Sequence, residues 1–396
     1  MNIIKSIKKE LSINKKINIE NVFNITKQVE KDISNSICHD LLFSRLSITH
    51  QIDPSTKKLN IAGCVKSPAY KQSLTHKVAN WPEEYHLLEK LIHREFLNLA
   101  QFWCEFEIHK IKSKYPESEN NEYKKLPLLE EAYHSKIVED IQSSRELYYT
   151  LHHTQPMSLS DAVLLMNLST FIADKGWYEM LENLTISSTG RHFILLTKTN
   201  ESISTIVGSA RIQQWDERHN WLSFSPFFNN EDWQLCLPSD IRNRCLQTKI
   251  FKDNYVPNCD SVYSFEKNFI ENILEKNRIC EVIRLSVSGT DQECTFYLFL
   301  TQKYLMRELD KRGFSIAYTI IEQPWMMNFY QGLKLNSYFS SSYKNLNDTG
   351  RNTYKGFWII PNLKTELNNT SFKNYKKIVI KNKGKKKQVS IGIYNV

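Results

Sequence analysis

The segment "ICEVIRLSV" (residues 279–287) decides the expected fold, because it has the composition of a strand at the centre of a sheet. Successive side chains of an extended segment point to opposite faces, so Glu281 is expected on one face and Arg284 on the other. Both faces are otherwise mostly apolar, which indicates a strand covered on both sides. A buried charge without a partner is strongly destabilising. Glu281 and Arg284 therefore each need a partner of their own or a ligand.

Strand and helix patterns alternate around this segment after Pro156. Strands follow a period of two and helices a period near 3.6, so the two kinds of pattern can be told apart. We therefore predict an α/β or α+β fold with a sheet of mixed or mostly antiparallel strands. The patterns are two strands within 191–215 joined by a turn at Asn200 to Ser202, strands at 314–321 and 335–340, helices at 295–314 and 324–333, and a helical insert at about 229–277.

Residues 1–155 are expected to form a mainly helical N-terminal region. Pro82 can open a helix in 80–112, and a second helical pattern runs from about Leu128 to His152. The first pattern has one apolar stripe, formed by Leu88, Ile92, Leu99, Phe102 and Phe106. His86, Glu89 and His93 also share a helix face, but without a matching group of ligands elsewhere we interpret them as a polar face and predict no metal site.

The composition of the 396 residues is that of a folded protein of about two domains. No apolar run approaches the length of a membrane span, so we expect a cytoplasmic protein without one. The eight cysteines include no C-x-x-C pair, which predicts reduced and mostly buried thiols.

Lysine gathers near the carboxyl end of the chain. Residues 373–387 contain eight lysines and no acid, so the rest of the chain carries only about +1 of the net charge of +9 (9 − 8 = 1). We expect residues 362–396 to form a basic, solvated tail. Docking of an acidic partner is the alternative interpretation.

Four motifs in a fixed order resemble acyl-homoserine-lactone synthases. The segment at 306–339 is similar to the end of a GNAT acyltransferase domain, and "CEVIRLSV" (280–287), "VGSARI" (207–212) and "FIADKGW" (171–177) resemble motifs of these synthases. The chain length, the helical first part and the insert are similar to the longer LuxM/AinS type. The resemblance implies a GNAT-like acyltransferase sheet flanked by helices over 157–361.

The sequence also departs from the family pattern. Asn167 stands where the family has an arginine, and "SSTGRHF" (187–193) stands where an acidic pair usually follows. Glu179 and Glu182 lie nearby and could replace that pair. The phosphate-binding loop of ordinary GNAT enzymes is missing at "SGTDQE" (288–293), which disfavours a conventional mode of acetyl-CoA binding.

The resemblance implies two substrates, S-adenosyl-L-methionine and an acyl thioester carried by acyl carrier protein or coenzyme A. The products would be an N-acyl-L-homoserine lactone, a quorum-sensing autoinducer with a medium chain such as octanoyl, and 5′-methylthioadenosine. S-adenosylmethionine is then a substrate, and no separate cofactor is expected.

The same resemblance implies roles for individual residues. Glu281 would act as the base for the substrate amine, with Arg211 as its catalytic companion, and Arg284 would bind S-adenosylmethionine. The planar guanidinium groups suit the substrate carboxylate, but the sequence does not say which arginine holds ligand and which orients Glu281. The alternative is a structural ion pair between Arg211 and Glu281.

Two further groups of residues are implied as ligand contacts. Phe171 and Trp177 would enclose the sulfonium by cation–π contact, with core aromatics as the alternative. An acyl pocket would lie where two central strands part, and ordinary core packing is the alternative for its residues. These residues are Thr319, Trp325, Met326, Met327 and Phe329.

Two other functions compete with this prediction. One is an ordinary GNAT N-acyltransferase that acts on another amine. The other is a nucleic-acid-binding protein that uses the lysine-rich tail, which ranks last because no binding fold and no interleaved aromatic residues accompany the lysines. We therefore expect no nucleic acid among the partners.

Overall fold

The computed structural model describes residues 3–13, 17–31, 36–117, 126–198, 203–226, 228–257, 259–321, 324–345 and 352–384. The chain divides into two compact units. One unit contains residues 1–119 and 164–185, and the other contains 120–163 and 186–396.

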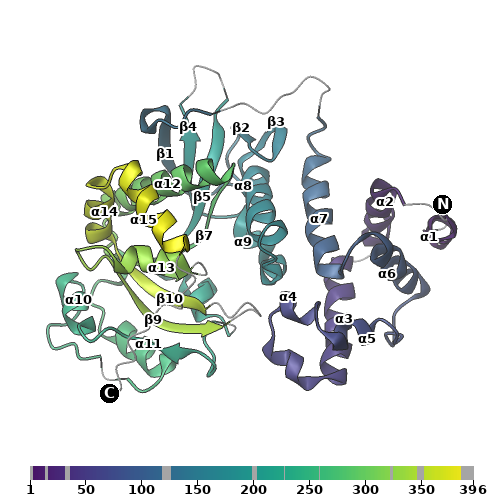
Figure 1. Cartoon of the computed structure of the whole chain (residues 1–396), viewed down its shortest axis with the longest axis horizontal. Coiled ribbons are helices and arrows are strands. Elements are labelled where there is room, and N and C mark those ends of the chain that lie inside the picture. Colours follow the sequence, from purple (N-terminus) through teal and green to yellow (C-terminus); the bar gives the residue numbers. More distant parts are fainter. Residues whose placement is uncertain are drawn as a thin grey trace. The chain divides into compact units, whose positions relative to one another are not determined.

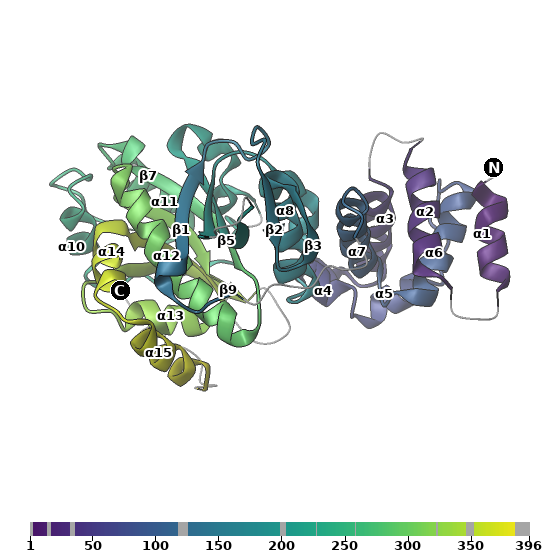
Figure 2. The same ribbon diagram turned by 90° about the horizontal axis from the view of Figure 1, so that it is seen from above.

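The first unit is helical, and Figure 2 shows its helices packed beside one another. Their amphipathic faces bury one another, as is usual for short helices that are not stable alone. They are α1 (Ile3–Ser12), α2 (Ile19–Glu30), α3 (Ile37–Ile52), α4 (Ile61–Cys64), α5 (Pro68–Ser73), α6 (Glu83–Glu95) and α7 (Leu99–Lys112), followed in this unit by the end of α8 (Leu159–Asn167), a π-helical turn at Leu168–Ala173 and a 3₁₀ turn at Tyr178–Asn183.

The predicted apolar stripe of residues 80–112 is confirmed, since all five of its side chains are buried. It belongs to two helices rather than one. Phe96 is extended and ends α6, and Asn98 begins α7 by accepting a hydrogen bond from the backbone N–H of Gln101 at 2.9 Å. An asparagine cap of this kind starts a new helix even where the apolar spacing continues.

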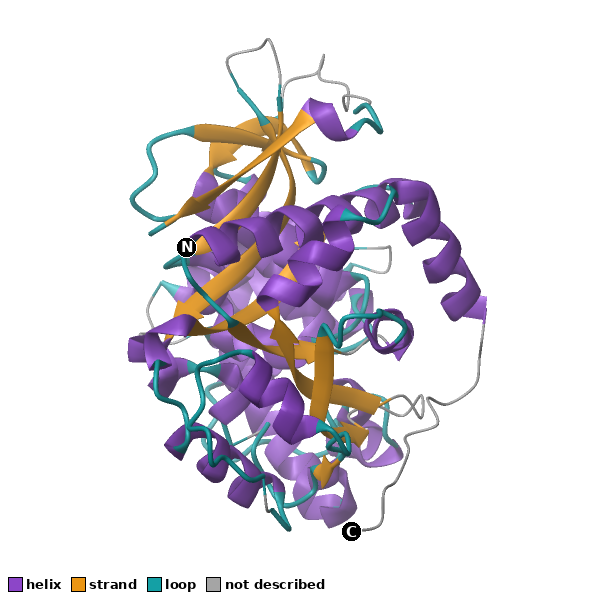
Figure 3. Ribbon diagram, turned by 90° about the vertical axis from the view of Figure 1, so that its left-hand side faces the viewer, coloured by secondary structure: helices purple, strands orange, loops and turns teal. Residues whose placement is uncertain are grey.

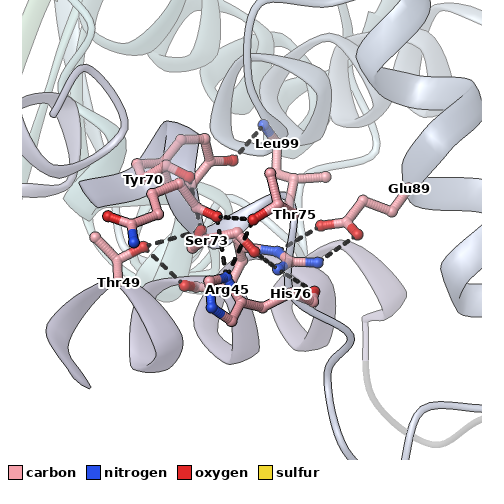
Figure 4. Close-up of polar contacts among 9 residues, drawn as sticks. Arg45, Thr49, Tyr70, Ser73, Thr75, His76, Glu89 and Leu99 are labelled. Carbon is pink, nitrogen blue, oxygen red and sulfur yellow. Dashed lines mark hydrogen bonds and ion pairs between the residues drawn. The ribbon is translucent and has the colours of Figure 1, made fainter. Parts of the chain in front are cut away.

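A buried ion pair joins three helices of the first unit (Figure 4). Arg45 of α3 donates to both carboxylate oxygens of Glu89 of α6, at 2.7 and 2.5 Å. The same guanidinium donates to the backbone carbonyls of Ser73, at the end of α5, and of His76. Glu89 therefore forms an ion pair with Arg45. The described residues contain no group of three or more His, Cys, Asp or Glu side chains arranged to hold a metal ion.

The second unit contains a sheet that, within the described residues, has ten strands, shown in orange in Figure 3. The main order is β1-β4-β5-β7-β8-β10-β9-β6, and β2 pairs with β3 and β5. The β7–β8 and β2–β5 pairs are parallel and the others are antiparallel, so the prediction of a mixed α/β sheet is confirmed. The strands are β1 (Tyr133–Val138), β2 (Leu147–Thr150), β3 (His153–Ser158), β4 (His192–Thr197), β5 (Thr205–Gln214), β6 (Gln234–Leu235), β7 (Ile279–Val287), β8 (Ile316–Ile321), β9 (Tyr338–Asn345) and β10 (Asn352–Ile359).

The helical pattern predicted from Leu128 to His152 is wrong, because these residues contain β1 and β2. Strand β1 pairs along its whole length with β4, and Tyr133 and Tyr148 are buried. Pairing with a neighbouring strand outweighs the weak local preference for helix. Strand β10 was not predicted from the sequence. The predicted β4–β5 pair is present. Its predicted turn at Asn200 to Ser202 lies outside the described residues.

Helices cover both faces of this sheet. Helix α12 (Asp291–Lys311) lies across one face beside α14 (Ile360–Asn368) and α15 (Phe372–Gly384), as Figure 1 shows, and α13 (Pro324–Gln331) contacts β8 and β9. The insert supplies α10 (Ile241–Gln247) and α11 (Val262–Glu271). Its aromatic side chains pack on Ile279 and Tyr318 of the other face.

The expected solvated tail is wrong for residues 372–384, which form α15. Phe372, Tyr375 and Val379 follow one another at helical spacing, and Tyr375 and Val379 are buried in the core beneath α12. The lysines between them occupy the remaining positions of an amphipathic helix. Residues 385–396 lie outside the described part of the chain.

Five of the eight cysteines are buried, in agreement with the prediction of mostly buried thiols. Across the described ranges, none of the helices combines the length and the apolar character that a membrane crossing requires.

Candidate active site

Strand β7 is irregular at Arg284. Ile283 pairs with Arg211 and Ser286 with Ser209, so β7 has two residues where β5 has only Ala210. Arg284 has a φ of 53°, a conformation that side-chain-bearing residues seldom adopt in a strand. This is a β-bulge, and a residue held in such a conformation costs about 1–3 kcal/mol, which is typical of functional sites.

The bulge overturns the prediction that Glu281 and Arg284 point to opposite faces. Arg284 donates through Nη1 to the hydroxyl of Ser187, and Arg211, on the Glu281 face, donates to the carbonyls of Ile186, at 3.1 Å, and Thr189. The extra residue shifts the alternation of β7, so both guanidinium groups reach the same segment, residues 186–190. The bulge could not be predicted from the sequence, because there is no glycine at this point.

Neither arginine has an acidic partner within ion-pairing distance among the described residues, although Arg211 is only 8% exposed and Arg284 only 7%. The Nε atoms of both are buried without a hydrogen-bond partner. Burial lowers the pKa of both arginines, that of Arg284 to about 9 with a smaller contribution from Arg211, so both stay charged at neutral pH. Glu217, Glu281 and Asp140 act on Arg211 only from beyond ion-pairing distance, and no acid of the described residues acts on Arg284, so the two buried guanidinium groups favour binding of an anion.

His192 is the third polar side chain of this site and was missed from the sequence. It lies directly across from Arg211 in the β4–β5 pair and is 1% exposed. Its Nδ1 is 3.1 Å from the carbonyl of Gly190, while Nε2 has no partner. Burial lowers the pKa of His192 to about 3, with further contributions from Arg211 and Arg284, so the ring is neutral. The segment "SSTGRHF" was notable in the sequence only for its lack of acids.

Gly190 allows Arg211 to occupy its position. Its φ is 75°, and a Cβ at this residue would lie 2.9 Å from the guanidinium nitrogens of Arg211. We expect Gly190→Ala to displace Arg211 and to raise KM about 10-fold or more for a substrate whose anionic group binds there, since one charge-assisted contact contributes roughly 1.5–3 kcal/mol. Steady-state kinetics measures this effect.

Gly313→Ala is the matched control for Gly190→Ala. Its φ is 81°, and a Cβ there would meet nothing within 4 Å. The two substitutions therefore carry a similar backbone strain, but only Gly190→Ala touches an arginine. Equal kinetic effects of both would show that backbone strain alone is responsible.

Glu281 is completely buried and holds a neighbouring segment of chain. Its two carboxylate oxygens accept hydrogen bonds from the backbone N–H groups of Leu222, at 2.9 Å, and Ser223, at 2.7 Å. Buried Lys355 holds the same segment by donating to the carbonyls of Ser223 and Phe228. Among the described residues no Arg211–Glu281 contact lies within ion-pairing distance, although Glu281 acts on the charge of Arg211 from further away.

The buried carboxyl of Glu281 makes stability depend on pH. Burial raises its pKa to about 7, although hydrogen bonds from Ser223 and Leu222 oppose the shift. The folded state therefore keeps a proton that the unfolded chain loses above its ordinary pKa of 4.5, and stability falls as the pH rises from 4.5 to about 7.

We expect the destabilisation caused by Glu281→Gln to be larger at about pH 5 than at about pH 8, by on the order of 3 kcal/mol. Between about pH 5 and pH 8 only the wild type loses the stability that the protonated Glu281 carboxyl contributes. Other titrating groups affect both proteins equally, so they cancel when the two free energies of unfolding are subtracted. Urea unfolding of both proteins at the two pH values measures it. A difference that does not change with pH would mean that Glu281 titrates normally.

The predicted acyl-pocket residues lie on the opposite side of the sheet from Glu281. Thr319 pairs with Val282, the neighbour of Glu281, and faces the α12 side. Met326, Met327 and Phe329 are buried in the same core cluster, which includes Val282. Trp325 lies on α13, but its side chain is outside the described part. The pairing of β7 with β8 ends at Val282 and Thr319, although both strands continue.

Phe171 and Trp177 belong to the first unit and form an edge-to-face pair with ring centroids 6.0 Å apart. The π-helical turn that carries Phe171 is a feature often found at functional sites. Nearby, Glu179 accepts a hydrogen bond from the backbone N–H of Ile61 at 2.5 Å, so it caps α4. The ligand roles of Phe171 and Trp177 stay predictions.

A mixed α/β sheet with a bulged central strand and parting parallel strands is consistent with an acyltransferase-like fold. Comparison with known proteins gives the particular family. The family described as acyl homoserine lactone synthase matches residues 14–389. No solved structure matches the chain.

Curated relatives agree with this family match. LuxM of Vibrio campbellii (strain ATCC BAA-1116) is 39% identical over 312 residues, which cover 78% of each chain. OpaM of Vibrio parahaemolyticus is 34% identical over 338 residues, 84% of this chain and 86% of the relative, and LuxM of Vibrio atlanticus is 36% identical over 302 residues, 76% of each. All three are acyl-homoserine-lactone synthases. The chain therefore belongs to the acyl homoserine lactone synthase family and is a quorum-sensing autoinducer synthase.

Proposed function

We propose that this enzyme transfers an acyl group from a thioester to S-adenosyl-L-methionine and closes the product to an N-acyl-L-homoserine lactone, with release of 5′-methylthioadenosine. The observation that carries the proposal is the pair of buried, unpaired guanidinium groups of Arg211 and Arg284. The carboxylate of the methionine portion supplies the missing negative charge, and each Nε–H gains an acceptor.

Both arginines bind ligand in this proposal. The contacts of Arg284 and Arg211 go to Ser187, Ile186 and Thr189, so neither arginine orients Glu281 by a direct hydrogen bond. Fixing the carboxylate also serves the second step, in which one of its oxygens attacks the carbon that bears the sulfonium. That leaving group is already activated, so alignment supplies most of the catalysis.

Glu281 was predicted as the base for the substrate amine. Its two backbone hydrogen bonds support a positioning role instead, because both oxygens already have donors. In this role it fixes Leu222 and Ser223 against the sheet beside the arginines. For Phe171 and Trp177, which belong to the first unit, contact with the sulfonium stays a sequence-based prediction.

The acyl chain is proposed to pass from the arginine face to the α12 face where β7 and β8 part. The end of their pairing at Val282 and Thr319 supports this path. Met326, Met327 and Phe329 would then contact the chain, with a medium length such as octanoyl. Each further methylene buried there contributes about 0.8 kcal/mol, so chain length is set by small changes in packing.

The test is an assay of the purified protein with S-adenosylmethionine and acyl donors of four to twelve carbons, followed by mass spectrometry. The expected products are a lactone and methylthioadenosine. Acylated product without methylthioadenosine would establish an ordinary N-acyltransferase instead. The absence of product with every donor would contradict the proposal.

The acyl donor is either acyl carrier protein, which is acidic, or acyl-CoA. Deletion of all residues after 366 cannot distinguish them, because it would remove the buried Tyr375 and Val379 of α15. Lys373 and Lys377 are exposed on that helix. If α15 docks the carrier protein, Lys373→Glu with Lys377→Glu raises KM for acyl carrier protein, most at low salt, and leaves KM for acyl-CoA unchanged. Equal effects on both donors would exclude α15 as the docking surface.

A further inference from the structure

The polar atoms left without partners around His192 are of two kinds. The Nε–H groups of Arg211 and Arg284 are donors. The ring of His192 must be protonated at Nδ1, because Nδ1 lies 3.1 Å from the carbonyl of Gly190 and a carbonyl can only accept. Nε2 therefore carries a lone pair and is an acceptor. Buried donors and acceptors without partners are costly, so such a set indicates a ligand with the complementary groups.

An α-amino acid carries that combination of groups. Its carboxylate accepts from the two arginines, and its amine donates to Nε2. We infer that His192 binds the α-amino group of S-adenosylmethionine and takes its proton during acyl transfer. The inference rests on the proposed function and names a residue for its first step.

Acyl transfer through His192 forms one bond to the carbonyl carbon and breaks another. The amine nitrogen forms a bond to the thioester carbonyl carbon, and the bond from that carbon to sulfur breaks. The proton lost by nitrogen moves to His192 Nε2 and then leaves with the thiolate as a thiol. The products are the amide and the free thiol, and His192 returns to its neutral form.

The charges around His192 explain how it becomes a base only when substrate is present. The groups that act on it are Arg211 on β5, Arg284 on β7 and Asp140, which accepts from the backbone N–H of Gly190 at 3.1 Å. Burial and then the two arginines hold the pKa of His192 near 3 in the free enzyme. A substrate carboxylate between the arginines cancels their effect, so the pKa of His192 rises on binding.

The test compares the wild type with His192→Gln, which is of similar size and keeps an amide at the position of the ring. We expect kcat to fall about 100-fold or more at neutral pH, the range for loss of a general base, and to recover as the pH rises and the free amine predominates. The wild type should bind S-adenosylmethionine about 10-fold or more tightly than an analogue without the α-amino group, and His192→Phe, which has no acceptor at this position, should bind both equally.

His93→Gln is the matched control. His93 is a partly buried histidine of the first unit whose pKa is lowered to about 4, mainly by burial. This substitution should leave kinetics and ligand preference unchanged. Because His192→Gln can fail to fold, the ring-nitrogen NMR signals of the wild type give a second measurement. The Nε2 signal of His192 should shift with S-adenosylmethionine and not with the analogue without the amine.

Two outcomes separate this inference from the proposed function. A wild type that neither binds S-adenosylmethionine nor forms lactone contradicts the proposed function. A wild type that does both, while His192→Gln keeps its kcat and pH profile and His192→Phe keeps the preference for the amine, overturns only the role of His192.

Discussion

Arg284→Met will lower kcat/KM for lactone formation about 1,000-fold or more without destabilising the protein. The loss in rate corresponds to about 4 kcal/mol, within the range for removal of a buried charged contact to a ligand. Stability is expected to stay constant or to rise by up to about 2 kcal/mol, because the substitution removes a buried charge that has no counter-ion in the free enzyme. Kinetics and urea unfolding measure the two effects.

Two further substitutions sharpen this prediction. Arg284→Lys keeps the charge but not the planar fork, so its activity should lie between those of the wild type and Arg284→Met. Arg278→Met removes an arginine next to the start of β7 that pairs with Glu275 on the surface, and it should stay within about twofold of the wild type. Loss of folding in Arg284→Met would instead show that Arg284 is a structural residue.

Glu89→Ala will destabilise the first unit by about 3–5 kcal/mol, because it leaves the charge of Arg45 buried and uncompensated. The side chains of Arg45 and Glu89 are 1% and 8% exposed, and the contact between them is bidentate. Thermal or urea unfolding, followed by a probe in the first unit, measures the loss.

Glu83→Ala is the control on the same helix. Glu83 pairs with Lys8, and these side chains are 57% and 55% exposed, so its loss should cost about 0–1 kcal/mol. A small effect of Glu89→Ala, similar to that of Glu83→Ala, would mean that water reaches Arg45 when its partner is removed.

The sequence predicts the fold well where a pattern is regular and covers a whole element. The strand from Ile279 and the helix that ends before Gly313 are both present, as is the β4–β5 pair. Prediction fails where contacts distant in the sequence decide the outcome. The strand pairing of β1 with β4 overrides a helical pattern, and the burial of Tyr375 turns part of a charged tail into α15.

The candidate site shows a similar division. Glu281, Arg211 and Arg284 could be selected from the sequence because buried charges in an apolar strand are unusual. The partners of these residues could not be predicted from the sequence. The bulge at Arg284 depends on the register between β5 and β7. The backbone groups that bind Glu281 come from Leu222 and Ser223, about sixty residues away in the chain. His192 belongs to no recognisable sequence motif, and only its pairing with Arg211 in the sheet identifies it as a candidate site residue.

The central claim is that Arg211 and Arg284 bind the carboxylate of S-adenosylmethionine, and calorimetry of ligand binding tests it most directly. The wild type should bind S-adenosylmethionine about 100-fold more tightly than its decarboxylated form, and Arg284→Met, which keeps Arg211, should retain only about a tenfold preference. Equal affinity of the wild type for the two ligands, or an undiminished preference in Arg284→Met, would contradict the claim.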